Sequence, residues 1–185
     1  MSDLHRRDGR TPTVLFMDEG RFGRISERAD CWAPRQVRPL VPRQVVRESL
    51  YALAAVEPRL ARLAFGLWSK CNTPSMSLLI LDLLAAWPDR RLLLVLDGAG
   101  WHKAKALPLP ERLRLLHLPA YTPECNPTEH IWDEVREKGF ANRFFATLAA
   151  VEAGLKTQLA LLSADPDRLR SITYFPWIRD ALLYV

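Results

Sequence analysis

The order of strand and helix patterns along the chain predicts an α/β fold, with helices packed on the faces of a sheet. Two short apolar runs, residues 13–17 (TVLFM) and 91–96 (RLLLVL), are typical of strands buried on both faces. Residues 45–56 and 60–68 are also β-compatible, and the turn-forming sequence Glu57-Pro58-Arg59 separates them. A helical pattern lies between the second of these strands and residue 91. This alternation favours one sheet that is covered by helices.

The remaining segments are assigned from their turn and capping residues. Residues 20–42 have no clear period and hold three prolines, so we expect a loop with a brief extended piece around Trp32. Residues 74–87 are expected to form a helix, with Thr73 as its N-cap and Pro88 ending it. The other expected elements are a flexible lead at residues 1–11, a strand at 113–118, helices at 127–137 and 147–162, and a short helix or irregular tail beyond. We therefore divide the chain into a lead (1–11), one domain (12–164) and a C-terminal tail (165–185).

Length and composition exclude several classes of protein. A chain of 185 residues with 49% hydrophobic residues is long enough for one domain with a real core. Its apolar runs are too short for a transmembrane helix, and the polar N-terminus does not resemble a signal peptide, so we expect a cytoplasmic protein with no membrane partner. The three cysteines are far apart, which argues against a disulfide framework and against a zinc site.

The positive charge of the chain is concentrated in one segment. Residues 21–47 contain seven arginines opposed only by Glu27 and Asp30, so this segment carries all of the net charge of +5. Arginine pairs with phosphate in a fork geometry, and the segment is therefore a candidate DNA-binding surface, although a solvated surface loop explains the charge equally well. The arginines are Arg21, Arg24, Arg28, Arg35, Arg38, Arg43 and Arg47.

Three acids are placed where an α/β sheet builds active sites. Asp18 and Asp97 each follow an apolar strand, and Glu129 opens a predicted helix 32 positions after Asp97. Carboxylate oxygens suit Mg²⁺ or Mn²⁺ better than zinc, and two such ions about 3.5–4 Å apart serve phosphodiester chemistry. Spacing alone leaves another interpretation open. The aspartates are also ordinary turn residues, and Glu129 falls where a helix capped by Asn126 would close a capping box.

The residues around the three acids form longer motifs. Residues 18–24 (DEGRFGR), 94–103 (LVLDGAGWHK) and 118–132 (LPAYTPECNPTEHIW) resemble, in order, the three blocks of the insertion-sequence-630 branch of the mariner-like DDE transposases. The resemblance covers about residues 12–162, including a match at 140–143 (FANR). It implies a ribonuclease-H-like fold, in which a mixed five-stranded sheet has its first three strands antiparallel and helices on its faces.

The resemblance also implies an activity and its partners. Members of this family cut phosphodiester bonds at transposon ends and join the freed 3′-hydroxyl to target DNA, using two Mg²⁺ ions that Mn²⁺ can replace. Asp18 would then bridge both ions, Asp97 would bind one and Glu129 the other. Pairing of two transposon ends implies a homodimer. The family's N-terminal helix-turn-helix region does not precede the first motif, so we expect it to be encoded separately or to be missing.

Some assignments stay open. A catalytically idle remnant that binds DNA or dimerises is the main alternative to an active transposase, and a ribonuclease-H-like nuclease acting on RNA or on junctions is a third. His102 and Asp133 are candidates for supporting the metal ligands, His102 by contacting a phosphate or a water on the metal. A structural histidine and a solvated helix charge are the respective alternatives. Glu19 is expected to point to the face opposite Asp18 and to be structural.

Overall fold

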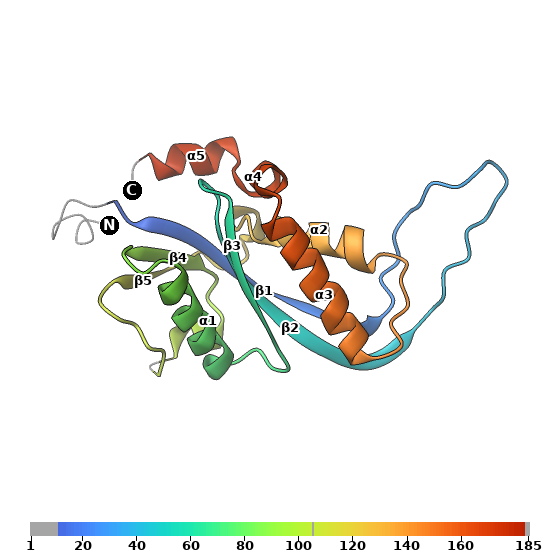
Figure 1. Ribbon diagram of the computed structural model, residues 1–185, viewed down its shortest axis with the longest axis horizontal. Coiled ribbons are helices and arrows are strands. Elements are labelled where there is room, and N and C mark those ends of the chain that lie inside the picture. Colours follow the sequence, from blue (N-terminus) through green and yellow to red (C-terminus); the bar gives the residue numbers. More distant parts are fainter. Residues whose placement is uncertain (1–10, 105, 184–185) are drawn as a thin grey trace.

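Five strands form one mixed sheet in the computed structural model, which describes residues 11–104 and 106–183. The strands lie in the order β3-β2-β1-β4-β5, with β1 in the centre (Figure 1). Pairs β1/β2 and β2/β3 are antiparallel, whereas β1/β4 and β4/β5 are parallel. The expected architecture is therefore confirmed. The strands are β1 (Thr13–Ile25), β2 (Val45–Glu57), β3 (Arg62–Trp68), β4 (Leu92–Leu96) and β5 (Leu113–His117).

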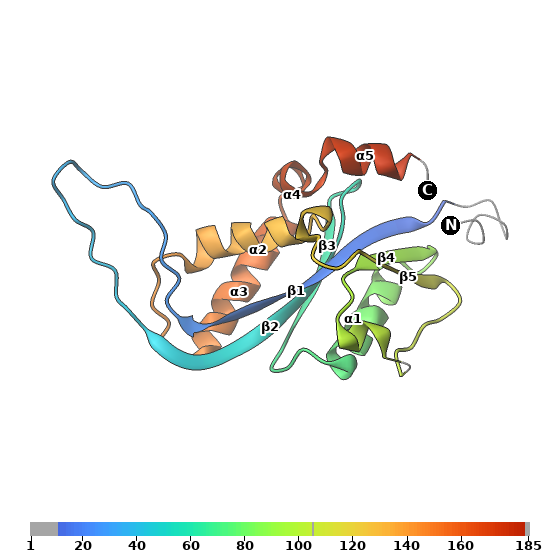
Figure 2. The same ribbon diagram turned by 180° about the vertical axis from the view of Figure 1, so that it is seen from behind.

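Helices cover both faces of this sheet, because the central strands are apolar on both sides. In β1, Val14 and Phe16 belong to a core that contains residues of α2 (Glu129–Val135) and α3 (Leu148–Ser163). The alternate residues Leu15 and Met17 belong to a second core under α1 (Thr73–Ala86), on the opposite face. The short helices α4 (Pro166–Thr173) and α5 (Pro176–Leu182) add Leu169 and Ile178 to the first core. Figures 1 and 2 show α1 apart from α2 and α3.

Two helix starts differ from the expected ones. Asn72, not Thr73, caps α1: its side chain accepts a hydrogen bond from the Ser75 amide at 3.1 Å, and the Ser75 hydroxyl accepts one from the Asn72 amide at 2.9 Å. The helix expected at residues 127–137 begins at Glu129 and continues beyond Val135 as a π-helical turn, Arg136–Phe140. None of the helices in the described residues is both long and apolar enough to cross a membrane.

Strand β1 is longer than the sequence predicted. It continues past Asp18 to Ile25, where its residues pair with β2, so the loop expected from residue 20 begins only after Ile25. Gly20 and Gly23 serve close packing here and not a turn: a Cβ at Gly20 would lie 2.7 Å from the Phe22 ring, and one at Gly23 would lie 2.5 Å from a backbone oxygen. No strand forms around Trp32.

Residues 26–44 form a long irregular arm that projects from the body of the molecule (Figure 1). The arm is closed at its base by the Ser26 amide, which donates to the Gln44 carbonyl at 3.0 Å. The Asn142 side chain also pairs with both backbone groups of Ala29, at 3.1 and 2.8 Å. Gln44 donates to the Phe145 carbonyl at 2.9 Å. The connection between α2 and α3 therefore fixes the base of the arm. The expected flexible lead, except Thr11, lies outside the described residues.

Candidate active site

Asp18 and Asp97 lie at the same end of the sheet, beside the point where β4 stops. Strands β1 and β4 are parallel and pair from Thr13/Leu92 to Phe16/Val95, after which β4 ends at Leu96. β1 runs on, and beyond Phe16 it pairs with β2 alone. Asp18 thus lies within a strand, whereas the sequence had suggested that it lies at the end of one. Its edge is uncovered because β4 stops there, which leaves room for Asp97 beside it.

Asp18 is buried and is held by a residue of α2. The Trp132 indole Nε1 donates a hydrogen bond to Asp18 Oδ2 at 2.8 Å, and 8% of Asp18 is exposed. Burial, and then the charge of Glu129, raise the pKa of Asp18 to about 7, although the hydrogen bond from Trp132 lowers it. Trp132 lies three residues after Glu129 on α2, so the helix that carries the third acid also orients the first.

Glu129 is the first residue of α2 and caps nothing. The N-cap is Thr128, which makes no side-chain capping hydrogen bond, so the capping-box alternative is wrong. The loop before the helix is tied to β1 instead. The Asn126 side-chain amide donates to the Met17 carbonyl at 3.0 Å, and the Thr128 hydroxyl donates to the Phe16 carbonyl at 2.9 Å. These bonds anchor the start of α2 directly beside Asp18.

Other acids contribute to the electrostatics at Glu129. Burial, then the charge of Asp133, raise the pKa of Glu129, and Asp97 raises it further. Asp133 is exposed, and its carboxylate lies 3.8 Å from His130 Nδ1. Asp133 therefore acts on the site through its charge, as a group on the same helix face one turn along.

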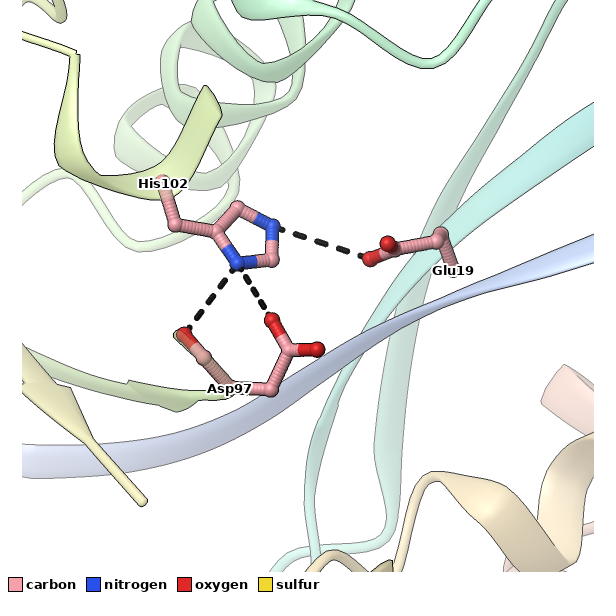
Figure 3. A group of neighbouring side chains, drawn as sticks. All are labelled: Glu19, Asp97 and His102. Carbon is pink, nitrogen blue, oxygen red and sulfur yellow. Dashed lines mark hydrogen bonds and ion pairs between the residues drawn. The ribbon is translucent and has the colours of Figure 1, made fainter. Parts of the chain in front are cut away.

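One oxygen of Asp97 is fixed by two donors. The Ala99 amide donates to Asp97 Oδ1 at 3.0 Å, and His102 Nδ1 lies 2.7 Å from the same atom (Figure 3). His102 is fully buried in the 3₁₀ turn η1 (Gly100–Lys103). Burial lowers the pKa of His102, and the neighbouring Asp97 opposes this shift. The structure thus places the histidine against Asp97 itself.

Glu19 belongs to the site, which the sequence interpretation missed. Its side chain points to the α1 face of β1, as expected, yet its Oε2 lies 3.6 Å from His102 Nε2. Burial, followed by the charges of Asp18, Asp97 and Glu129, raises the pKa of Glu19 to about 8. The sequence signal that could have found Glu19 is its position directly after Asp18. Where a neighbouring strand ends, two consecutive residues can both contribute to a site beside the unpaired strand edge, although they point to opposite faces of the sheet.

The three predicted acids are spread more widely than a single ion requires. Within the described residues, Glu19, Asp97 and His102 are the only three side chains of metal-binding type whose ligand atoms all lie within 4.8 Å of one another. Glu129 and Asp97 nevertheless both raise the pKa of Asp18, and Asp97 also raises that of Glu129, so the three acids lie close enough to interact through their charges. Their all-oxygen donor set fits Mg²⁺ or Mn²⁺, and a wider spread suits two ions.

The seven arginines divide into two groups. Arg21 and Arg24 on β1 are engaged within the protein: Arg21 Nε donates to Ser49 at 2.9 Å, and Arg24 pairs with Glu48 at 2.7 Å. The other five are exposed, and their side chains make no hydrogen bond or ion pair with any residue that the structure describes. Four of these lie on the arm and one at the start of β2: Arg28, Arg35, Arg38, Arg43 and Arg47.

All three cysteines are free.

Comparison with known proteins decides the family. Residues 13–152 match the family model described as DDE superfamily endonuclease. The chain belongs to this family. It is 33% identical, over 128 residues, to an uncharacterised protein (y4pE/y4sA) of Sinorhizobium fredii, and the match covers 69% of this chain and 95% of that one.

Solved structures of the Mos1 transposase share the fold. A pre-cleavage Mos1 transpososome superposes with a TM-score of 0.68 at 12% identity, covering 98% of this chain and 57% of the Mos1 chain. A Mos1 paired-end complex with Mn gives a TM-score of 0.67 at 14% identity, covering 97% and 56%. The chain thus spans little more than half the length of these Mos1 chains. The fold is ribonuclease-H-like, as expected.

The raised pKa values predict how the metal-free protein responds to pH. The folded chain keeps protons on Asp18 and Glu19 that the unfolded chain releases near the ordinary pKa values of 3.8 and 4.5. The free energy of unfolding should therefore fall as pH rises from about 4 to about 8, and level off above. Asp18→Asn removes the contribution of Asp18, at most about 4 kcal/mol for a shift of roughly three pKa units.

Urea unfolding in EDTA at a series of pH values checks this prediction. The variant should lose less stability than the wild type between pH 5 and pH 8.5, flanking the pKa of about 7, because all other titrating groups are common to both proteins. Parallel stability curves would contradict the assigned burial of charge at Asp18.

Proposed function

We propose that this chain is the catalytic domain of a DNA transposase of the insertion-sequence-630 branch. It would cut phosphodiester bonds at the ends of a mobile element and join the freed 3′-hydroxyl to target DNA. The observation that supports this most is that Asp18, Asp97 and Glu129 are acids whose charges interact: those of Glu129 and Asp97 both raise the pKa of Asp18. Such a cluster is stable with its charges on when cations bind between the carboxylates. Membership of the DDE endonucleases supports the same conclusion.

Two Mg²⁺ ions, which Mn²⁺ could replace, are the proposed cofactors. Asp18, Asp97 and Glu129 would hold these ions through their carboxylate oxygens. Two bound ions supply activation of the attacking oxygen and stabilisation of the leaving oxygen. Mos1 paired-end complexes have been solved with Mn and with Mg, which supports the choice of metal.

The protein's own residues would keep these carboxylates in place. Trp132 holds Oδ2 of Asp18 through the hydrogen bond from its indole nitrogen. Asn126 and Thr128 fasten the start of α2 to β1 and so set the position of Glu129. We propose His102 and Asp133 as supporting residues: His102 contacts Asp97 directly, and Asp133 adds negative charge beside Glu129. This arrangement orients three ligands before any metal binds.

DNA is the proposed partner, both as transposon ends and as target. The arginines predicted to contact phosphate include five with no partner among the described residues, and most of these lie on the arm. We further propose that two copies act together on paired ends, and that a helix-turn-helix region outside residues 12–164 selects the ends. Residues 12–164 would form the catalytic domain, with α4 and α5 of the expected C-terminal tail (165–185) packed against it.

Metal-dependent nicking of DNA tests the proposed activity. Supercoiled plasmid should be nicked with Mg²⁺ or Mn²⁺ and not with EDTA, and Asp18→Asn, Asp97→Asn and Glu129→Gln should each abolish nicking. Loss of an outer-shell partner of a metal costs about 10–100-fold, so loss of a ligand should cost at least about 100-fold. Glu124→Gln, which changes an exposed acid in the segment just before α2, should leave the rate unchanged. Folded wild-type protein that binds DNA without cutting it would favour the idle-remnant alternative.

Trp132 offers a matched comparison within this chain. Trp87 Nε1 donates to buried Glu57 at 2.9 Å, a bond of the same type at the far end of β2. Trp132→Phe and Trp87→Phe should each lower the free energy of unfolding by about 1.5–3 kcal/mol, as hydrogen bonds to charged groups do. Only Trp132→Phe should weaken Mn²⁺ binding, measured by calorimetry, because only Trp132 orients Asp18. An equal effect of both variants on Mn²⁺ affinity would refute the assigned role.

Because its arginines are exposed and unpaired among the described residues, we expect the arm to bind DNA in a salt-dependent way. Each lost phosphate contact should reduce the slope of log K against log salt by about 0.9 for duplex DNA. Arg35→Gln with Arg38→Gln should therefore reduce the slope by up to about 2 in fluorescence-anisotropy titrations. Arg59→Gln with Arg90→Gln makes the same charge change at exposed sites outside the arm, and should leave the slope unchanged. Equal slopes for both double variants would exclude the arm as the contact surface.

A further inference from the structure

A chain of side chains runs from β1 to the residue that follows β4 through the buried His102. His102 Nδ1 lies 2.7 Å from Asp97 Oδ1 and 3.2 Å from the Asp97 carbonyl, whereas Nε2 lies 3.6 Å from Glu19 Oε2 (Figure 3). Asp97 follows β4 and Glu19 lies on β1, so the imidazole spans the two strands at the edge where the site is built. Only 1% of His102 is exposed.

The geometry fixes which nitrogen of His102 carries hydrogen. Both atoms that Nδ1 faces, Asp97 Oδ1 and the Asp97 carbonyl, are acceptors, so Nδ1 is the donor. With the Ala99 amide, this gives Asp97 Oδ1 two donors. The other carboxylate oxygen points away from the ring in Figure 3, and the Asp97 side chain is half exposed. One oxygen of Asp97 is thus fixed by the protein and the other is presented outward.

On the side of the imidazole that faces Glu19, buried polar atoms lack hydrogen-bond partners in the described part of the chain. Among the described residues, His102 Nε2 and Glu19 Oε2 are two of only three buried side-chain polar atoms without a hydrogen-bond partner. Buried atoms in this state cost stability, so their retention needs an explanation other than stability. Glu19 fills the space against Nε2, and it prevents the ring from moving away from Asp97 towards β1.

We propose that His102 is a positioning residue for Asp97, and that Glu19 keeps the imidazole in its place from β1. The inference rests on the proposed function, because it makes the presented oxygen of Asp97 a metal ligand. A cation held by Glu19, Asp97 and His102 themselves is disfavoured. Asp97 Oδ1 already accepts two N–H groups, and a cation there would have to displace both.

In this proposal β1 determines the positions of both Asp18 and Asp97. Asp18 and Glu19 are neighbours on opposite faces of β1, and Asp18 is a proposed ligand while Glu19 supports the other aspartate through His102. The distance between Asp18 and Asp97 is thereby set by one rigid strand and one imidazole. A histidine at this position serves better than a smaller donor because its two nitrogens reach both strands.

Two substitutions of His102 separate the roles of its nitrogens. In His102→Asn the side-chain amide nitrogen replaces Nδ1, so the donor to Asp97 is kept and the contact with Glu19 is lost. In His102→Gln the amide nitrogen reaches towards the position of Nε2, and the donor to Asp97 is lost. Mn²⁺ binding to the full chain without DNA, measured by calorimetry and by electron paramagnetic resonance, should stay within about threefold for His102→Asn. It should weaken about 10–100-fold for His102→Gln.

Glu19 provides a second matched pair. Glu19→Gln and Glu19→Ala remove the same charge, but only the glutamine keeps the bulk that supports the ring. Mn²⁺ affinity should therefore be several-fold lower for Glu19→Ala than for Glu19→Gln. If His102→Asn weakens Mn²⁺ binding as much as His102→Gln does, the positioning role is wrong. Zn²⁺ or Mn²⁺ binding that survives Asp18→Asn and is lost in His102→Asn would show instead that His102 is a ligand.

A readout without metal keeps this proposal separate from the proposed function. Nitrogen-15 NMR of histidine in the metal-free protein should show His102 with hydrogen on Nδ1, and hydrogen on Nε2 alone would overturn the positioning role. A wild-type chain with the expected NMR signature and the expected His102 pattern of Mn²⁺ binding, but no nicking, would contradict the transposase assignment alone. Normal nicking with unchanged Mn²⁺ affinity in His102→Gln would contradict the positioning role alone.

Discussion

The extension of β1 beyond the end of β4 is the constraint on which the site depends. Parallel pairing stops at Phe16 and Val95, and β1 continues on its antiparallel partner β2. This leaves one edge of β1, a strand that is otherwise central, unpaired at Asp18 and Glu19, which lie on opposite faces of it. Because β2 supports the extension over its whole length, the carboxylates stand on a rigid strand and not on a loop. The close approach at Gly20, where a Cβ would meet Trp132, lets α2 lie near enough to reach Asp18.

Charge is divided sharply between two regions of this small chain. Acids gather at the sheet edge, where burial and the charges of neighbouring acids raise the pKa values of Asp18 and Glu19, while unpaired arginines gather on the arm. Neither region neutralises the other. Among the described residues no ion pair joins an arm arginine to Asp18, Asp97 or Glu129. Each region is therefore left with charge that calls for an external partner: cations at the acids, and an anion such as a phosphate backbone at the arm.

The sequence predicted the sheet well because its signals were local. The apolar runs at residues 13–17 and 91–96 and the turn at Pro58 each determine one element, and the resemblance supplied their order. The extent of β1 was missed because Gly20 and Gly23 were interpreted as loop residues, whereas their small size serves contacts with Trp132 and β2. Glu19 was set aside for a similar reason. Strand alternation correctly placed Glu19 on the face opposite Asp18. The contact between Glu19 and His102 depends on where β4 ends in the folded sheet, and the local sequence does not encode that.

The same device recurs at both aspartates, and this links the motifs to the chemistry. Each carboxylate has one oxygen bound by an aromatic nitrogen, Trp132 for Asp18 and His102 for Asp97, and each donor lies within a few residues of an acid in its own motif. A ring donor is stiff, so it fixes the carboxylate plane with few rotatable bonds of its own. Because one oxygen of each aspartate is held in this way, the direction of its other oxygen is also set. The tryptophan and the histidine thus explain why the motifs extend beyond the acids: the acids supply ligands, and the aromatic residues determine where those ligands point.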